Sequence, residues 1–178
     1  VQDDSEPALQ TAAAVFEEQI KSGSKLYMAA GNYGLALIAL HRKDIAEAKT
    51  RLQQVKKTVG EAAARQSLAL NSLAIEIMLA SNQTADAVRE ARAAIARFPS
   101  SRALAHQYAN ALYMSRQYGE AAKFLRKQVQ MYREDPVLQR QLARVYDAQG
   151  KRALMHMAMA ESYSLTGAYS AALEQLDL

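Results

Sequence analysis

Apolar residues recur every three or four positions along almost the whole chain, a spacing that places them on one face of an α-helix. Ala, Leu, Gln, Arg and Glu, which favour helices, dominate these stretches, and no stretch alternates as a β-strand does. Polar, Gly or Pro residues interrupt the pattern at 22–24, 41–44, 81–84, 98–101, 134–136, 149–150 and 166–167. Because the breaks are short, we expect neighbouring helices to run antiparallel, as a string of helix pairs.

The helix pairs repeat. Segments 45–48, 84–87, 118–121 and 169–172 each open with a bulky or β-branched residue and carry Ala three positions later, and these alanines are 39, 34 and 51 residues apart. A helix-turn-helix period of 34 residues resembles the tetratricopeptide repeat (TPR). Other matching residues are Ala36, Ala109, Ala143 and Ala160 where helices should cross, Tyr146 and Tyr163, the turn residues Gly150 and Gly167, and Pro99. The predicted fold class is an all-α TPR right-handed superhelix of antiparallel helix pairs.

The repeats predict one TPR-like domain over 1–178. It has an N-terminal helix over about 1–24 and repeat units over 25–60, 61–100, 101–135, 136–166 and 152–178. The 39-residue interval indicates an insertion around 58–61. The 51-residue interval exceeds the period by 17, which is also the spacing from Gly150 to Gly167. We interpret this as one continuous helix, over about 152–164 and including Met155 and His156, that closes the fourth unit and opens the fifth; the alternative is a degenerate repeat.

The composition argues against an enzyme site in this chain. The 178 residues are 50% hydrophobic and 22% charged, with no Cys, which excludes disulfides and thiolate metal sites. His41, His106 and His156 lack the His-Glu-x-x-His spacing of a helical zinc site, and the Gly31–Gly34 segment lacks the pattern of a phosphate-binding loop. We therefore predict no catalytic, cofactor or metal residue here. No apolar run is long enough for a membrane span.

The net charge of +4 is uneven. Between positions 89 and 152 there are 13 Lys and Arg against 5 Asp and Glu, and the remainder is acidic. The cations are spread at helical spacings, so we expect solvated helix faces and no nucleic-acid partner.

Function then depends on a surface. In stacked helix pairs the first helices line the concave side, at the fifth and ninth residues of each unit. Those positions hold Tyr33, Leu37, Ser72, Glu76, His106, Asn110, Arg140, Arg144, Met157 and Glu161. Met155 and Met159 are expected to pack inward. Arg140 and Arg144, one turn apart, suit carboxylates of a protein partner, although each is also compatible with an ordinary solvated residue. Only Asn110 matches the set with which some TPR domains hold a C-terminal carboxylate.

Segments 32–37, 44–49, 136–139, 142–143 and 160–169 give a closer resemblance. They are similar to the C-terminal TPR region of the periplasmic zinc metalloproteases of Gram-negative bacteria, the β-barrel assembly-enhancing protease type. The resemblance implies a periplasmic protein whose zinc-binding protease domain precedes this chain, and partners among the outer-membrane assembly machinery or its substrates. Val1 in place of Met agrees with a piece of a longer protein.

The sequence thus favours a non-catalytic interaction module, the TPR arm of such a protease acting in outer-membrane protein assembly and quality control. The alternative is a stand-alone TPR scaffold for pilus or secretion-system assembly. A helical hydrolase or transferase domain is a third possibility, which the missing catalytic residues disfavour.

Overall fold

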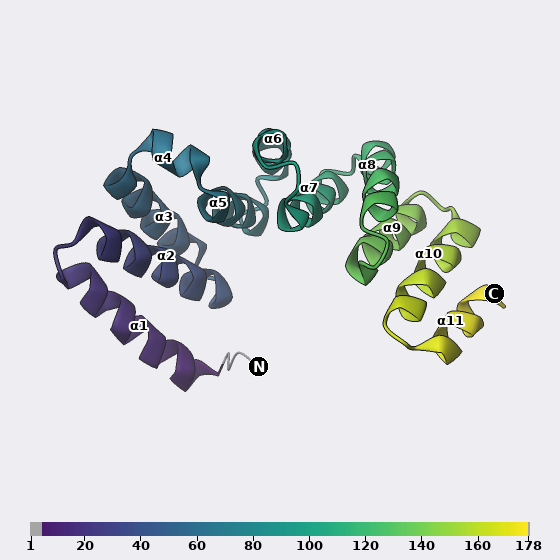
Figure 1. Ribbon diagram of the computed structural model, residues 1–178, viewed down its shortest axis with the longest axis horizontal. Coiled ribbons are helices and arrows are strands. Elements are labelled where there is room, and N and C mark those ends of the chain that lie inside the picture. Colours follow the sequence, from purple (N-terminus) through teal and green to yellow (C-terminus); the bar gives the residue numbers. More distant parts are fainter. Residues whose placement is uncertain (1–4, 178) are drawn as a thin grey trace. The chain divides into compact units, whose positions relative to one another are not determined.

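The chain folds into helices joined by short loops over residues 5–177, the part that its structure, a computed structural model, describes (Figure 1). The helices are α1 (Glu6–Lys21), α2 (Lys25–His41), α3 (Ile45–Val59), α4 (Glu61–Gln66), α5 (Leu68–Ala80), α6 (Thr84–Arg97), α7 (Arg102–Met114), α8 (Tyr118–Met131), α9 (Pro136–Ala148), α10 (Arg152–Leu165) and α11 (Tyr169–Leu176). Every predicted break coincides with a loop or a helix end. Positions 1–4 of the expected N-terminal helix, and Leu178 of the last expected unit, lie outside the described residues.

Side-chain caps and left-handed residues fix where the helices begin and end. The side chains of Asp44, Ser67, Ser101 and Asp135 accept hydrogen bonds from backbone N–H groups in the first turns of α3, α5, α7 and α9. Within the described residues, seven connections between successive helices contain a residue with positive φ: Gly23, Lys43, Gly60, Asn82, Arg116, Gly150 and Gly167. A left-handed residue after a helix ends it and turns the chain back.

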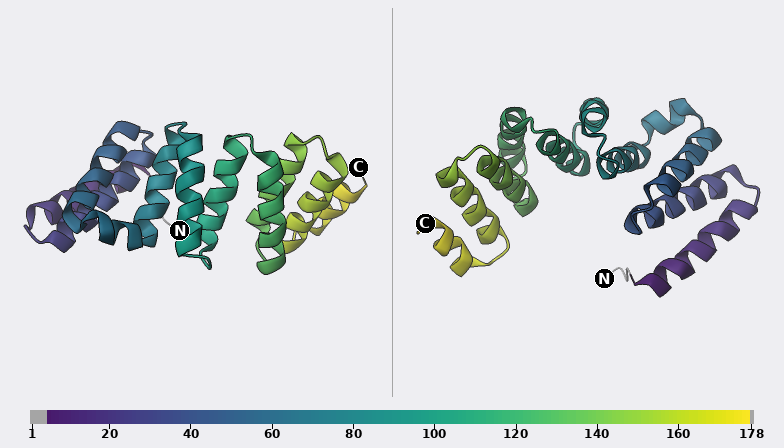
Figure 2. Two further views of the ribbon diagram at one scale, coloured as in Figure 1. Left: turned by 90° about the horizontal axis from the view of Figure 1, so that it is seen from above. Right: turned by 180° about the vertical axis from the view of Figure 1, so that it is seen from behind.

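Buried alanines bring the helices close together. The alanines predicted at crossings and second-helix positions are at most 8% exposed: Ala36, Ala48, Ala87, Ala109, Ala121, Ala143, Ala160 and Ala172. Contacts join α2 with α3, α7 with α8, α9 with α10, and α10 with α11, and Figure 2 shows these pairs from two further sides. The predicted all-α class of paired helices is confirmed.

The contacts divide the chain into two compact units, residues 1–83 and 84–178. The boundary falls in the turn between α5 and α6, inside the repeat expected over 61–100. In the first unit α2 packs against α1 and α3, and α3 packs against α5. Leu52, Val55, Leu73 and Ile77 belong to its buried core.

Two glycines of α2 let α1 approach closely. A Cβ at Gly31 would lie 2.5 Å from the backbone oxygen of Phe16, and one at Gly34 would overlap the Phe16 ring. Larger residues at either position would therefore force the two helices apart.

The insertion expected around 58–61 corresponds to the start of the short helix α4. Gly60, with φ of 87°, separates α3 from α4. At the other end of α4, the Asn71 Nδ2 donates to the backbone oxygens of Arg65 at 3.0 Å and Ser67 at 2.6 Å. This buried amide gives the Arg65 carbonyl at the end of α4 a partner, and it shares the Ser67 carbonyl with the backbone N–H of Asn71 in α5.

In the second unit α7 packs against α6, α8 and α9, and α9 packs against α8 and α10. Its most buried large side chains include Leu104, Leu112, Leu125 and Leu138. The helix α10 is continuous through Met155 and His156 and contacts both α9 and α11.

Candidate protein-binding surface

Helices α7 and α9 lie against each other in the second unit and run in the same direction. His106, early in α7, contacts Gln141, and Tyr113, near the end of α7, contacts Arg144 further along α9. Asn110 lies 34 residues before Arg144, which is the predicted repeat period. Asn110 and Arg144 therefore occupy equivalent positions on the two helices.

Arg144 is exposed but held in place by an aromatic ring. Its guanidinium carbon lies 4.4 Å from the centroid of the Tyr113 ring, and the Tyr113 ring lies 5.6 Å from that of Tyr118 on α8. A guanidinium over an aromatic face is stabilised by about 0.5–1 kcal/mol at an exposed site. This cation–π contact occupies none of the guanidinium N–H donors, so they stay available to an acceptor.

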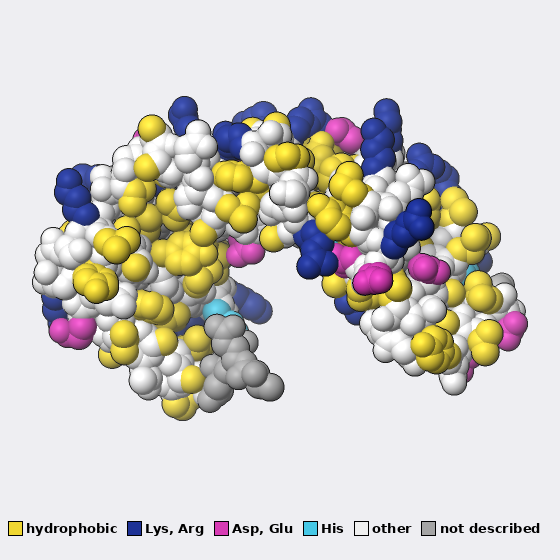
Figure 3. All heavy atoms as spheres, viewed as in Figure 1, with side chains coloured by type: hydrophobic (Ala, Val, Ile, Leu, Met, Phe, Trp, Pro, Cys, Tyr) yellow, Lys and Arg dark blue, Asp and Glu magenta, His cyan; other side chains and the backbone are white. Residues whose placement is uncertain are grey.

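Arg140 is exposed one turn earlier on α9. Unlike Arg92, which pairs with Glu120 at 2.6 Å, neither Arg140 nor Arg144 has an acidic partner among the described residues. Figure 3 shows Lys and Arg side chains over α9 and projecting from α6 and α8, without one continuous block. The two α9 arginines therefore form a local cationic pair on one helix face.

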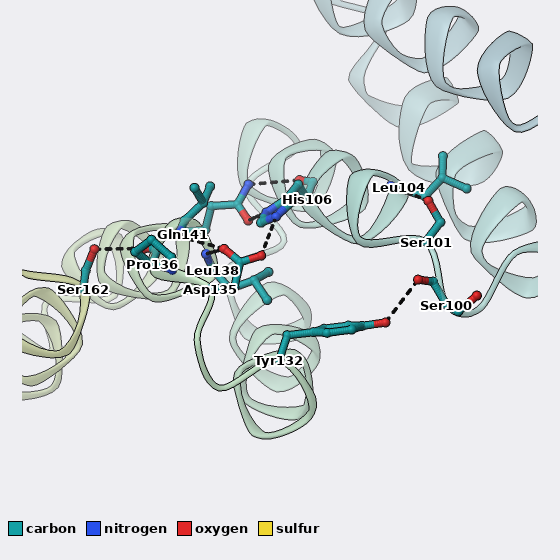
Figure 4. Close-up of polar contacts among 11 residues, drawn as sticks. Ser100, Ser101, Leu104, His106, Tyr132, Asp135, Pro136, Leu138, Gln141 and Ser162 are labelled. Carbon is teal, nitrogen blue, oxygen red and sulfur yellow. Dashed lines mark hydrogen bonds and ion pairs between the residues drawn. The ribbon is translucent and has the colours of Figure 1, made fainter. Parts of the chain in front are cut away.

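A polar network joins α7 to the start of α9 next to this pair (Figure 4). The two ring nitrogens of His106 lie 3.0 Å from Oδ2 of Asp135 and 3.1 Å from Oε1 of Gln141. Gln141 Nε2 donates to the backbone oxygen of His106 at 3.0 Å, and Oδ1 of Asp135 accepts from the N–H groups of Val137 and Leu138.

The network gives His106 a role that its sequence position did not suggest. Its side chain is 23% exposed, and Asp135, which caps α9, is 8% exposed. The Asp135-Pro136 pair signals a helix start, so the cap was predictable. The His106 contacts were not, because they join residues 29 and 35 positions apart. His106 thus links α7 to the start of α9, the helix that carries Arg140 and Arg144.

The other predicted binding residues form two further groups. In the first unit Tyr33 packs half-buried against the core, while Leu37 and Glu76 are exposed and Ser72 is half-buried. Burial, and then repulsion by Glu76, raises the pKa of Tyr33 above its usual value. Glu76 therefore lies close enough to Tyr33 to disfavour its ionised form.

Met157 and Glu161 lie on α10. With Tyr169 and Leu173 of α11 they line a hollow of about 440 Å³, and Met157 is 60% exposed. Met155 and Met159, which were expected to pack inward, are half-buried. The structure thus brings Arg140, Arg144 and Asn110 onto one pair of helices, and places Met157 and Glu161 on another.

One polar cluster was missed in the sequence. The Tyr108 hydroxyl donates to Glu120 at 3.0 Å, and Arg92 donates to Tyr108 at 3.1 Å and to Glu120 at 2.6 Å. Burial raises the pKa of Tyr108, with Arg92 acting in the opposite direction. The cluster links α6, α7 and α8, which indicates a structural role.

Within residues 5–177, no three His, Asp or Glu side chains come close enough to share a metal ion. The zinc that the family resemblance implies therefore has no fitting ligand set in this part of the chain. Nor does any helix of the described chain combine the length and apolar character needed to cross a membrane.

Comparison with solved structures identifies the repeat type. The chain superposes with a TM-score of 0.69 on YrrB, described as a TPR protein with an unusual peptide-binding site; the match covers 97% of this chain and 85% of YrrB at 14% identity. The fold is a tetratricopeptide-repeat fold. A scan against protein-family models gives no match. A search of curated proteins likewise gives none. At this identity the likeness to YrrB concerns the fold alone.

Proposed function

We propose that this chain is a non-catalytic protein-binding module that engages partners through the surface of α7 and α9 around Arg140, Arg144 and Asn110. The observation that carries the proposal is the pair of exposed arginines without an acidic partner among the described residues, one of them stacked on Tyr113. Holding a cation in place before binding lowers the entropy that binding costs. The peptide-binding site named for YrrB, which shares the fold, supports a polypeptide ligand.

For the cellular context, we propose that the module is the TPR arm of an exported zinc metalloprotease that acts in outer-membrane protein assembly and quality control in the periplasm. The support is the resemblance of segments 32–37, 44–49, 136–139, 142–143 and 160–169 to that family. In this account a preceding domain holds the zinc, and the present chain selects partners among assembly factors or their substrates.

Binding to an array of random synthetic peptides tests the proposed activity. The chain should retain peptides enriched in Asp and Glu, and R140E/R144E should lose them. The matched control is K123E/K127E, which reverses two exposed cations four residues apart on α8. Retention of the same peptides by R140E/R144E, or no retention by the original chain, would contradict the proposal.

The gene that encodes this chain tests the context. A His-Glu-x-x-His segment encoded upstream of Val1 supports the protease arm, and a lipid-attachment Cys there supports the scaffold alternative instead.

A further inference from the structure

We infer that the ligand of the α7 and α9 surface is an extended polypeptide segment with two acidic residues separated by one residue, Asp/Glu-x-Asp/Glu. The inference rests on the proposed function and specifies its ligand. It follows from the spacing of the arginines, the fixed guanidinium of Arg144, and the scarcity of apolar surface around them.

The spacing of Arg140 and Arg144 selects the spacing of the acidic residues. Four residues of an α-helix rise about 6 Å, so the two side chains leave α9 about 6 Å apart along its axis. In an extended segment, residues i and i+2 point to the same side and lie about 6.7 Å apart. Residues i and i+1 point to opposite sides, as do i and i+3. Two carboxylates with one residue between them therefore match both arginines at once.

The stack on Tyr113 makes this match selective. Because the Arg144 guanidinium lies against the ring, its position along α9 is restricted, and a carboxylate must come to it. Arg140 makes no such ring contact with any residue of 5–177 and can adjust to the second carboxylate. One fixed and one adjustable cation favour a ligand whose charges have a defined spacing over a diffuse acidic region.

The surroundings favour an extended segment over a helix. A partner helix would need an apolar stripe facing α9 at about 8–10 Å between axes. The large apolar side chains of α7 and α9 with exposed surface are Met114 and Val137, at 40% and 39%. Tyr113, which contacts Arg144, is half-buried, and Asn110 and Gln141 are polar. This surface can form hydrogen bonds with a peptide backbone and ion pairs with carboxylates, but it has little apolar area for the apolar face of a helix.

Asn110 adds a contact of the right kind. Among the residues that the structure describes, its Nδ2 makes a single long contact, 3.8 Å, to the sulfur of Met114. The side chain is half-buried at the position equivalent to Arg144. An amide can donate to and accept from the backbone of an extended segment. Asn110 therefore serves the ligand backbone while the arginines serve its side chains.

The experiment measures fluorescence anisotropy of the full chain with dye-labelled, end-blocked nine-residue peptides at low ionic strength. All peptides share one composition of Ser, Thr, Gly and two Glu, with the glutamates at i,i+1, i,i+2 or i,i+3, and a further peptide has Gln in place of both. We expect the i,i+2 peptide to bind at least about fivefold more tightly than the other spacings. R144Q should abolish this preference and R140Q should reduce it.

The control K123Q/K127Q changes net charge by more than either single variant and should leave the preference intact, since both lysines lie on α8. Equal binding of all Glu spacings, lost in R144Q, would overturn the inference while leaving the proposed function standing. Absence of binding by every peptide here and on the random array would overturn both. Tighter binding of a helix-stapled peptide with glutamates at i,i+4 would show that the ligand is a helix and would also overturn the inference.

Discussion

Asp135→Ala should destabilise the second unit more than the loss of any other helix cap, because the Asp135 side chain both caps α9 and contacts His106. Its Oδ1 accepts from the N–H groups of Val137 and Leu138 at 3.0 and 3.2 Å, and its Oδ2 lies 3.0 Å from His106. Loss of an N-cap costs about 1 kcal/mol, and leaving the partly buried His106 ring without its Asp135 partner costs about 1–3 kcal/mol more. We expect a total of about 3 kcal/mol, or a fall in Tm of about 6–12 °C.

The assay is urea unfolding followed by circular dichroism, combined with hydrogen exchange of the Val137 and Leu138 amides. Ser101→Ala is the matched control, because Ser101 caps α7 through one hydrogen bond, to the Leu104 N–H at 3.3 Å. It should cost only about 1 kcal/mol. Asp135→Asn, which keeps an oxygen for the cap, should fall between the two. Equal losses for Asp135→Ala and Ser101→Ala would refute the reasoning, since they would show that the contact with His106 contributes nothing.

Two further predictions concern the first unit. Gly34→Ala should cost about 1–3 kcal/mol of unfolding free energy, because its methyl group would overlap the Phe16 ring and displace α1. The control Gly119→Ala, which has no atom near a new Cβ, should not destabilise the protein. Equal stability of both variants in urea would contradict the close packing of α1 on α2. The raised pKa of Tyr33 means that folding favours its neutral form, so its contribution to stability is complete below about pH 10, the usual tyrosine value, and is lost as the pH rises further. Urea unfolding at pH 9 and pH 11 should show a smaller loss for Tyr33→Phe than for the original chain, and equal losses would show that Tyr33 ionises without affecting the fold.

The helices and their crossings could be predicted because local features specify them. Apolar spacing, turn residues and small alanines act within a few positions. Ala36, Ala109 and Ala143, predicted where helices cross, are at most 1% exposed. The continuous α10 likewise follows from uninterrupted apolar periodicity between two glycines.

The site was less predictable because its contacts connect different repeats. Arg140 and Arg144 were placed on one exposed helix face, which a four-residue spacing suffices to suggest. The contact of Arg144 with Tyr113 joins residues 31 positions apart, and the contact of His106 with Gln141 joins residues 35 positions apart. Both depend on how the side chains of different repeats are oriented. The close approach at Gly34 depends on where α1 docks. No local pattern encodes these contacts.

The most direct test of the central claim is the NMR signal of each arginine side-chain Nε–H group while the i,i+2 glutamate peptide is added to the full chain. With the binding surface on α7 and α9, the signals of Arg140 and Arg144 should move together to saturation, while that of the exposed Arg126 on α8 stays in place. Unchanged signals of Arg140 and Arg144, or an equal shift of Arg126, would contradict a binding surface on α7 and α9.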